Sequence, residues 1–261
     1  MEEDSIDFLP PYEAIEGKSQ IDDTKPATFI LVDRVIVSEN APSTPLYQIN
    51  YDITSTKQRH SSVAFESVEN DPPLLGIKGG APINPEPRPL FYLAHPQDPQ
   101  YREDRPPYYL TSVSPGSLGN IALEISKSRL QRTEYRFSLS PNRNWMDDIL
   151  FDRDAQLLFS VKSKLIGGRL AWTDSNGFQL AYEDGKDAQH RLVITVPMKV
   201  EIRHALVATW CLRLWHDTAE SRQAKKEALE RMTPPEAIRE IPDRQMATRI
   251  GVMGAFGGAG A

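Results

Sequence analysis

A chain of 261 residues is long enough for one large β domain or two small ones, and its 39% hydrophobic and 25% charged residues allow a true core beneath a charged surface. The net charge of −6 lies in residues 1–25, where eight acids face two bases, so the rest of the chain is balanced and lacks the basic footprint of a nucleic-acid-binding protein. A single cysteine, Cys211, excludes an internal disulfide framework and favours a reducing compartment, which we take to be the cytoplasm with the nucleus left open.

The two ends of the chain differ from its middle, which predicts one folded domain over residues 27–217. Residues 1–26 are acidic and contain prolines, so we expect a disordered tail, and they lack the basic and apolar regions of a signal peptide. Residues 218–261 combine a charged helical extension over 219–232 with a Gly/Ala-rich end that we expect to be mobile. No stretch approaches the ~20 apolar residues that a transmembrane segment needs.

Short runs of alternating apolar residues fill the first part of the domain and are separated by turn signals. Such alternation is typical of strands that bury one face, and Asn176-Gly177 is a strong hairpin turn between two of the runs. Their number and spacing predict a mostly β fold with about twelve strands, as an antiparallel barrel or a sandwich. The runs cover residues 29–32, 35–37, 47–53, 63–65, 90–93, 108–113, 121–125, 135–139, 157–161, 170–172, 180–182 and 192–196.

After Pro197 the pattern changes from strand to helix. Apolar residues from Val200 to Trp215 are too dense for alternation and, at about 100° per residue, cover every side of a helix. Such a helix is either buried or membrane-spanning, and this one is too short and too charged, with Arg203 and Arg213, to span a bilayer. We therefore expect a barrel that closes around a central C-terminal helix.

Three local patterns resemble the Tubby C-terminal-like superfamily, which includes the tubby proteins, the phospholipid scramblases and the plant LURP-one-related proteins. They are the strand Val32–Val37, the hairpin Leu170–Gly177 continued by 180–183, and the apolar helix Ala205–Trp215, and the similarity extends over about residues 28–216. The resemblance implies a twelve-stranded barrel threaded by a helix. Tubby proteins bind phosphoinositides through basic residues and scramblases need a membrane helix, but a shared fold does not carry function over to this chain.

Motifs that would indicate catalysis or metal binding are weak. The five histidines have no ligand spacing, and Pro115 takes the first glycine position of the elbow-like sequence around Ser117, which we interpret as a turn. Cys211 lies within the apolar helix and is expected to act as a small hydrophobic residue, and the acids from Asp147 to Asp154 are expected in a solvated loop. Because a helix would fill the barrel, we predict a non-enzymatic binding or scaffold module without metal or cofactor.

Two segments resemble ligands of WW domains, which bind extended proline-rich peptides in aromatic grooves. The first fits the Leu-Pro-x-Tyr variant and the second fits Pro-Pro-x-Tyr, although the tyrosine of the second could instead be a strand residue. If they function, the protein is an adaptor that recruits WW-domain partners of the HECT-type ubiquitin-ligase class. The motif residues are Leu9, Pro10 and Tyr12 in the tail, and Pro106, Pro107 and Tyr109 before a predicted strand.

A basic stretch gives the alternative surface site. Arg132 and Arg136 share one face of a predicted strand with Glu134, and Lys162 and Lys164 share a face of another. If these strands are neighbours, the outer wall carries a positive patch that suits an anionic phospholipid headgroup or a phosphate, and otherwise it is an ordinary solvated face. The candidate residues are Lys127, Arg129, Arg132, Arg136, Lys162 and Lys164.

Overall fold

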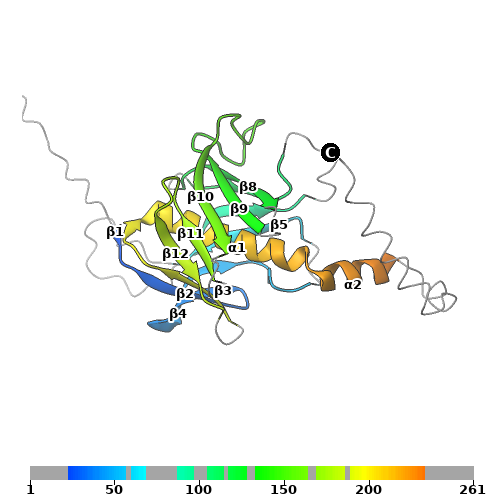
Figure 1. Cartoon of the computed structure of the whole chain (residues 1–261), viewed down its shortest axis with the longest axis horizontal. Helices are drawn as coiled ribbons and strands as arrows, with labels where there is room; N and C mark the ends of the chain where they lie inside the picture. The colour runs from blue at the N-terminus through cyan, green and yellow to red at the C-terminus, as the bar shows by residue number, and fades with distance from the viewer. Residues whose placement is uncertain are drawn as a thin grey trace, which may run out of the picture.

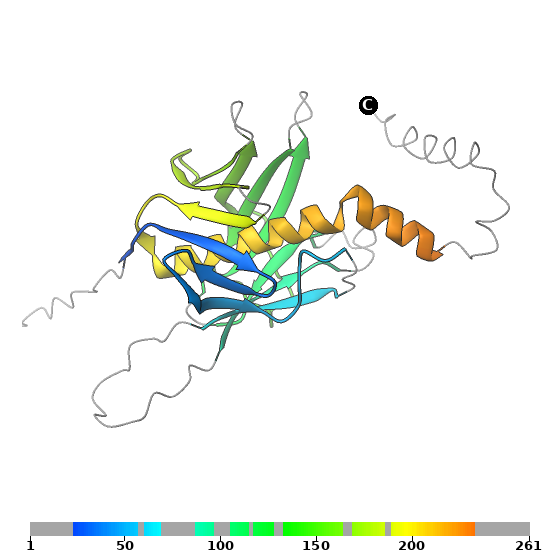
Figure 2. The same ribbon diagram turned by 90° about the horizontal axis from the view of Figure 1, so that it is seen from below.

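The computed structural model describes residues 23–56, 60–68, 87–96, 105–114, 117–127, 133–163, 169–185 and 189–232. Within these residues twelve strands form a closed antiparallel barrel around one helix, as the sequence predicts (Figures 1 and 2). The barrel strands are β2 (Ala27–Val32), β3 (Val35–Ser38), β4 (Ala41–Ile49), β5 (Ser62–Ser67), β6 (Arg88–Ala94), β7 (Tyr109–Ser112), β8 (Asn120–Lys127), β9 (Thr133–Ser140), β10 (Gln156–Ser163), β11 (Leu170–Thr173), β12 (Gln179–Glu183) and β13 (His190–Ile194).

The barrel is an up-and-down meander in which each strand pairs with the next along the chain. The exception is the closing pair, in which β13 lies antiparallel to β2 with His190 opposite Leu31 and Ile194 opposite Ala27. Closure leaves no exposed edge that could pair with another chain. Alternation decides which side chains enter the core, as in β5, where Val63 and Phe65 are fully buried.

Helix α1 (Val200–Ala219) lies inside the barrel and emerges at the end where α2 (Arg222–Met232) begins (Figure 2). Its twelve consecutive residues from His204 to Trp215 are all buried, so the sheet surrounds the helix on every side. The sequence correctly predicted a buried helix followed by a charged helical extension over 219–232, which the structure divides between the last turn of α1 and α2. Among the described residues, no helix is long and apolar enough to cross a membrane.

The folded chain begins earlier than the boundary at residue 27 that composition predicts. β1 (Asp23–Thr24) pairs with β14 (Met198–Lys199), which leads directly into α1. The hydroxyl of Thr24 also donates a hydrogen bond to the carbonyl oxygen of Met198 at 3.0 Å. This two-stranded sheet ties the start of the barrel to the start of the helix.

The two ends of the barrel carry different connections. At the end where α1 emerges, hereafter the exit end, β8 stops at Lys127, β9 starts at Thr133, β10 stops at Ser163 and β12 stops at Glu183. At the opposite end, β9 stops at Ser140 and a long connection leads to β10. The two ends of the barrel therefore present different sets of side chains.

Two glycines with positive φ allow a test of the barrel geometry. A Cβ at Gly119 (φ +121°) would lie 2.4 Å from the carbonyl oxygen of Ser140, whereas a Cβ at Gly177 (φ +82°) would meet nothing within 4 Å. We expect Gly119→Ala to lower the free energy of unfolding by at least about 3 kcal/mol and Gly177→Ala by only about 1 kcal/mol, because the first adds overlap with the backbone to the cost of positive φ. Urea unfolding of both variants measures the difference, and equal losses would contradict the close approach of β8 to β9.

Candidate functional site

The interior of the barrel is packed with side chains from both the sheet and α1. Phe29, Tyr47, Phe65 and Trp172 from the wall belong to the same continuous core as Trp210 on the helix, and each of these rings is fully buried. Cys211 is buried in this core as predicted, and burial raises the pKa of its thiol, so it supplies no thiolate at neutral pH. The described interior is therefore filled by the protein's own side chains.

His204 is the buried histidine of α1. Its Nδ1 atom lies 2.9 Å from the hydroxyl of Tyr47, and the two rings meet edge to face. Burial, reinforced by the positive charges of Arg203 and Arg88, lowers the pKa of His204 to about 4. The side chain is therefore neutral at physiological pH and holds α1 to β4.

A buried ion cluster marks the exit end of α1. Arg213 is 3% exposed and forms ion pairs with Glu183 on β12 and with Asp217 one turn further along the helix. Trp172 Nε1 donates to Glu183 Oε1 at 3.0 Å, and the Tyr135 hydroxyl donates to Asp217. Each partner of Arg213 thus has a second hydrogen bond, as buried charges require.

The environment moves the two carboxyl pKa values in opposite directions. Burial raises the pKa of Glu183, and the charge of Arg213 and the hydrogen bond from Trp172 only partly oppose it. Burial alone would also raise the pKa of Asp217, but hydrogen bonds from His216 and Tyr135 and the charge of Arg213 bring it below its usual value. Both carboxyl groups pair with the guanidinium of Arg213.

An aromatic cluster covers this ion cluster at the exit end. The Tyr108 ring stacks on His95 at 4.0 Å between centroids, and its hydroxyl lies 3.2 Å from His95 Nε2 and 3.4 Å from Glu220 Oε1. Burial, and then the charge of Glu220, raises the pKa of Tyr108, and burial and Asp217 do the same for Tyr135. These phenols stay protonated at neutral pH, so the Tyr135 hydroxyl can donate to Asp217 and the Tyr108 hydroxyl to Glu220.

The basic residues that the sequence singled out are brought together only in part. β8, β9 and β10 are neighbours, as the positive patch requires. However, exposed Arg136 is paired in register with Glu124, and Lys162 Nζ lies 3.2 Å from Glu134 Oε1, so this part of the wall is charge-balanced. Arg129, Arg132 and Lys164 lie outside the described residues, as does the side chain of Lys127.

The two WW-ligand motifs have different outcomes. Tyr109 is the first residue of β7, only 6% exposed, and its ring contacts Phe151 at 5.4 Å between centroids. A WW domain needs that tyrosine ring, so the motif at Pro106 and Pro107 does not present it in this fold. The tail motif, Leu9, Pro10 and Tyr12, lies outside the described residues.

The connection between β9 and β10, residues 141–155, is a feature that sequence reasoning missed. Leu150 and Phe151 cover Ala94 and Tyr109 on the outer wall and form a second, smaller apolar cluster. Trp145 in the same connection lies edge to face with Tyr92 at 6.3 Å and is 49% exposed. The connection therefore folds back over β6 and β7 and holds an indole at the surface.

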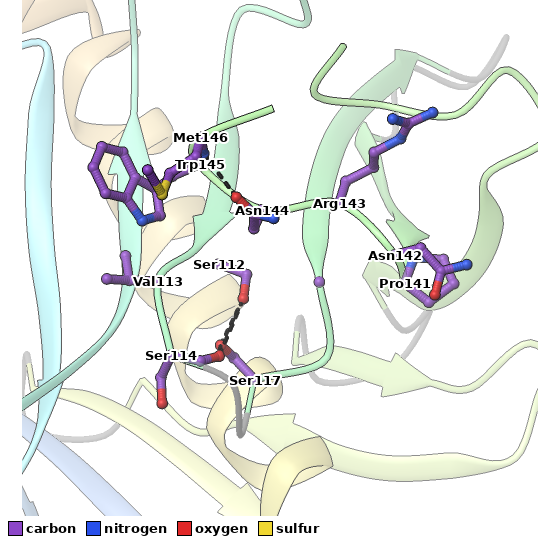
Figure 3. A pocket seen from close by; sticks show the side chains of 11 residues that line it. Ser112, Val113, Ser114, Ser117, Pro141, Asn142, Arg143, Asn144, Trp145 and Met146 are labelled. Atoms are coloured by element: carbon purple, nitrogen blue, oxygen red, sulfur yellow. Dashed lines mark hydrogen bonds between the residues drawn. The ribbon is translucent and has the colours of Figure 1, made fainter. Parts of the chain in front are cut away.

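Trp145 is among the residues that line two separate hollows. One, of about 350 Å³, is lined by Ser112, Ser117, Asn144 and Met146 among others (Figure 3). The other, of about 530 Å³, is lined by Tyr92, Arg105, Thr111 and Leu150 among others. In Figure 3 the Arg143 side chain points away from Trp145 and Met146, which lie on the same side of the connection.

Hydrogen bonds fix this connection closely. The side chain of Asn120, fully buried, accepts from the Ser112 N–H and donates to the carbonyl oxygens of Asn144 at 3.1 Å and Leu150 at 2.9 Å. The backbone N–H of Trp145 donates a hydrogen bond to the carbonyl oxygen of Ser112 at 3.1 Å. The acids of this segment lie in a loop as expected, with Asp148 and Asp154 exposed, while Asp152 also pairs with Arg143 at 2.7 Å.

Comparison with known proteins gives no relative, since no protein-family model, no curated protein and no solved structure matches this chain. In the ranges that the structure describes, no group of three or more His, Cys, Asp or Glu side chains is arranged to hold a metal ion. The function is therefore inferred from the chemistry of the surfaces above.

The lowered pKa of His204 predicts a loss of stability in acid. The unfolded chain takes up a proton below pH 6.5 whereas the folded chain does so only near pH 4, so stability falls as the pH drops through this window. The loss attributable to His204 is about 3 kcal/mol, since one pKa unit corresponds to about 1.4 kcal/mol. Denaturant unfolding at pH 7 and pH 4 should show a smaller decline for His204→Gln than for the wild type, and equal declines would show that His204 is not the group responsible.

The Arg213 pair predicts a strongly non-additive mutant cycle. Arg213→Met leaves Glu183 buried without its cation and should cost about 3–5 kcal/mol, whereas adding Glu183→Gln should recover much of that loss. Lys226→Met is the control, because the exposed pair with Glu230 contributes less than about 0.5 kcal/mol. Urea unfolding of the set gives the coupling energy, and a double variant as unstable as Arg213→Met would contradict the role assigned to Glu183.

Proposed function

We propose that the protein is a non-enzymatic binding module that recognises a phosphate-bearing anion at the exit end of its barrel. The observation that carries the proposal is the burial of twelve consecutive α1 residues, which fills the interior and leaves the outer surface for recognition. A filled barrel favours binding over catalysis, because a reaction needs a concave site with titratable groups free to transfer protons.

The location of the anion site follows from how charges are distributed along β8, β9 and β10. On the described wall Glu124 and Glu134 offset Arg136 and Lys162. The remaining excess is in the two connections at the exit end, where residues 127–132 contain three bases and residues 164–168 one, with no acid in either, whereas Arg169 pairs with Asp184 at 3.8 Å. β8 ends opposite the start of β9, and β9 pairs with β10, so both connections leave neighbouring strands.

Phosphate oxygens are the ligand that such a group of Arg and Lys side chains suits best. Arginine binds phosphate through two parallel hydrogen bonds and lysine acts as a point charge, and each cation near an anionic membrane adds about 1 kcal/mol. The phosphate can belong to a lipid headgroup or to a free inositol phosphate. Lys127, Arg129, Arg132 and Lys164 are the residues that we assign to it.

We also infer that the chain is a distant member of the Tubby C-terminal-like superfamily. The closed meander of twelve strands around a buried C-terminal helix supports this inference, since the resemblance implied that arrangement. The hairpin of the resemblance is formed by β11 and β12, whose Trp172 and Glu183 take part in the ion cluster of α1.

The anion site predicts binding to phosphatidylcholine vesicles that contain a phosphatidylinositol phosphate. Sedimentation should show binding that falls with added salt, and Arg129→Glu with Arg132→Glu should weaken it about 30-fold or more, because two cations worth about 1 kcal/mol each are lost and reversed. The matched control reverses Arg153 and Lys199, two exposed bases outside the two basic connections. Competition by a soluble inositol phosphate separates headgroup recognition from a general affinity for surfaces.

Failure has two clear forms in this experiment. Absence of binding at low salt would remove the proposal for both the lipid and the soluble phosphate. Equal weakening by the control pair would show that only net charge matters and that the exit end is not a site.

A further inference from the structure

We propose that the connection between β9 and β10 is a docking surface for a basic segment of a partner protein that carries apolar anchor side chains. This surface, hereafter the Trp145 surface, comprises Trp145, Met146, Asp148, Ile149 and the two hollows beside Trp145. It is distinct from the anion site and does not depend on it.

Exposed apolar side chains are concentrated at this surface. Trp145, Met146 and Ile149 are 49%, 75% and 62% exposed and lie within five residues of one another. The other large exposed apolar side chains of the described chain, such as Val32 and Phe178, occur singly on other elements. A cluster of this kind marks an interaction site, and tryptophan and methionine are enriched at the centres of protein interfaces.

The surface is held rigid before any partner arrives. Asn144 Oδ1 accepts the Met146 N–H at 2.8 Å, and Asp147 Oδ2 accepts the Asn144 N–H at 2.7 Å. These bonds add to the tethers from Asn120 and Ser112 described above. A side chain displayed on an ordered backbone loses less entropy on binding, so the same contacts give higher affinity.

The hollows beside Trp145 provide the concave part of the site. Their volumes of about 350 and 530 Å³ are in the range of pockets that accept small ligands or large side chains. Trp145 lines both hollows, so an extended segment that contacts the indole has a hollow for more than one anchor side chain.

Charge selects a basic protein segment as the occupant. Residues 142–155 contain four acids and two bases, and Asp152 is already paired with Arg143. Arg105 lines the larger hollow, so acids outnumber bases at this surface by four to three. Exposed Asp148 lies between Met146 and Ile149, so a partner that covers these side chains also meets a carboxylate. An anionic bilayer would be repelled, and burying aspartate among lipid tails costs about 3 kcal/mol, so a lysine- or arginine-bearing peptide is favoured over a membrane.

A random peptide library displayed on phage tests the proposal with the full-length protein. Selection should enrich peptides that combine Lys or Arg with aromatic or aliphatic residues, and counter-selection against Trp145→Ser with Met146→Ser should remove them. Calorimetry with one enriched peptide should show affinity weakened about tenfold or more by the double variant and several-fold by Asp148→Lys. Phe178→Ser is the matched control, because it removes an equally exposed apolar side chain elsewhere and should leave affinity unchanged.

Tryptophan emission supplies an independent measurement. Trp172, Trp210 and Trp215 are buried, so only Trp145 of the four tryptophans changes from water to a covered site, and its emission should shift to shorter wavelength on adding the peptide. Enrichment of acidic peptides, or of peptides indifferent to the double variant, would overturn the proposal. A shift with anionic vesicles but not with peptides would assign the surface to membranes instead.

Discussion

The enclosure of α1 by a closed sheet is the constraint on which the rest of the structure depends. A barrel of twelve strands is too wide to be filled by its own inward side chains, so it needs an inserted element, and an all-round apolar helix needs a surrounding wall. Neither part can bury its apolar surface without the other. The hydrophobic effect therefore makes the sheet and the helix one cooperative unit.

An all-round apolar helix, however, has no preferred rotation within an apolar tube. The charged and polar residues of α1 set its rotation, since Arg213 pairs with Glu183 on β12 and His204 forms a hydrogen bond with Tyr47 on β4. These two contacts lie near opposite ends of the buried segment and on different sides of the barrel. We infer that they fix the depth and rotation of α1, which is the best attested use of buried polar groups.

The sequence predicted the barrel well because its signals are local. Alternating runs mark the strands, the density of apolar residues marks the buried part of α1, and the charged residues after Asp217 mark the helical extension that becomes α2. The Trp145 surface, by contrast, was missed. Exposed apolar residues in a loop have no period, and their tether, Asn120, lies 24 residues from Asn144 in the chain. Strand register, which places Glu124 beside Arg136, also could not be predicted from the sequence.

The closing pair β13–β2 has a consequence for how the protein is made. The wall joins the first barrel strand to the last, and the helix that fills it follows that last strand, so a growing chain cannot finish its core until residues 200–219 have left the ribosome. Until then the strands can form only an open sheet with unpaired edges, whose inward apolar side chains remain exposed to water. A stop before α1 would leave such a sheet permanently, and the closing pair β13–β2 must also wait for the two strands that lie furthest apart in the chain. This topology therefore requires that the nascent chain be protected from aggregation until α1 has been synthesised.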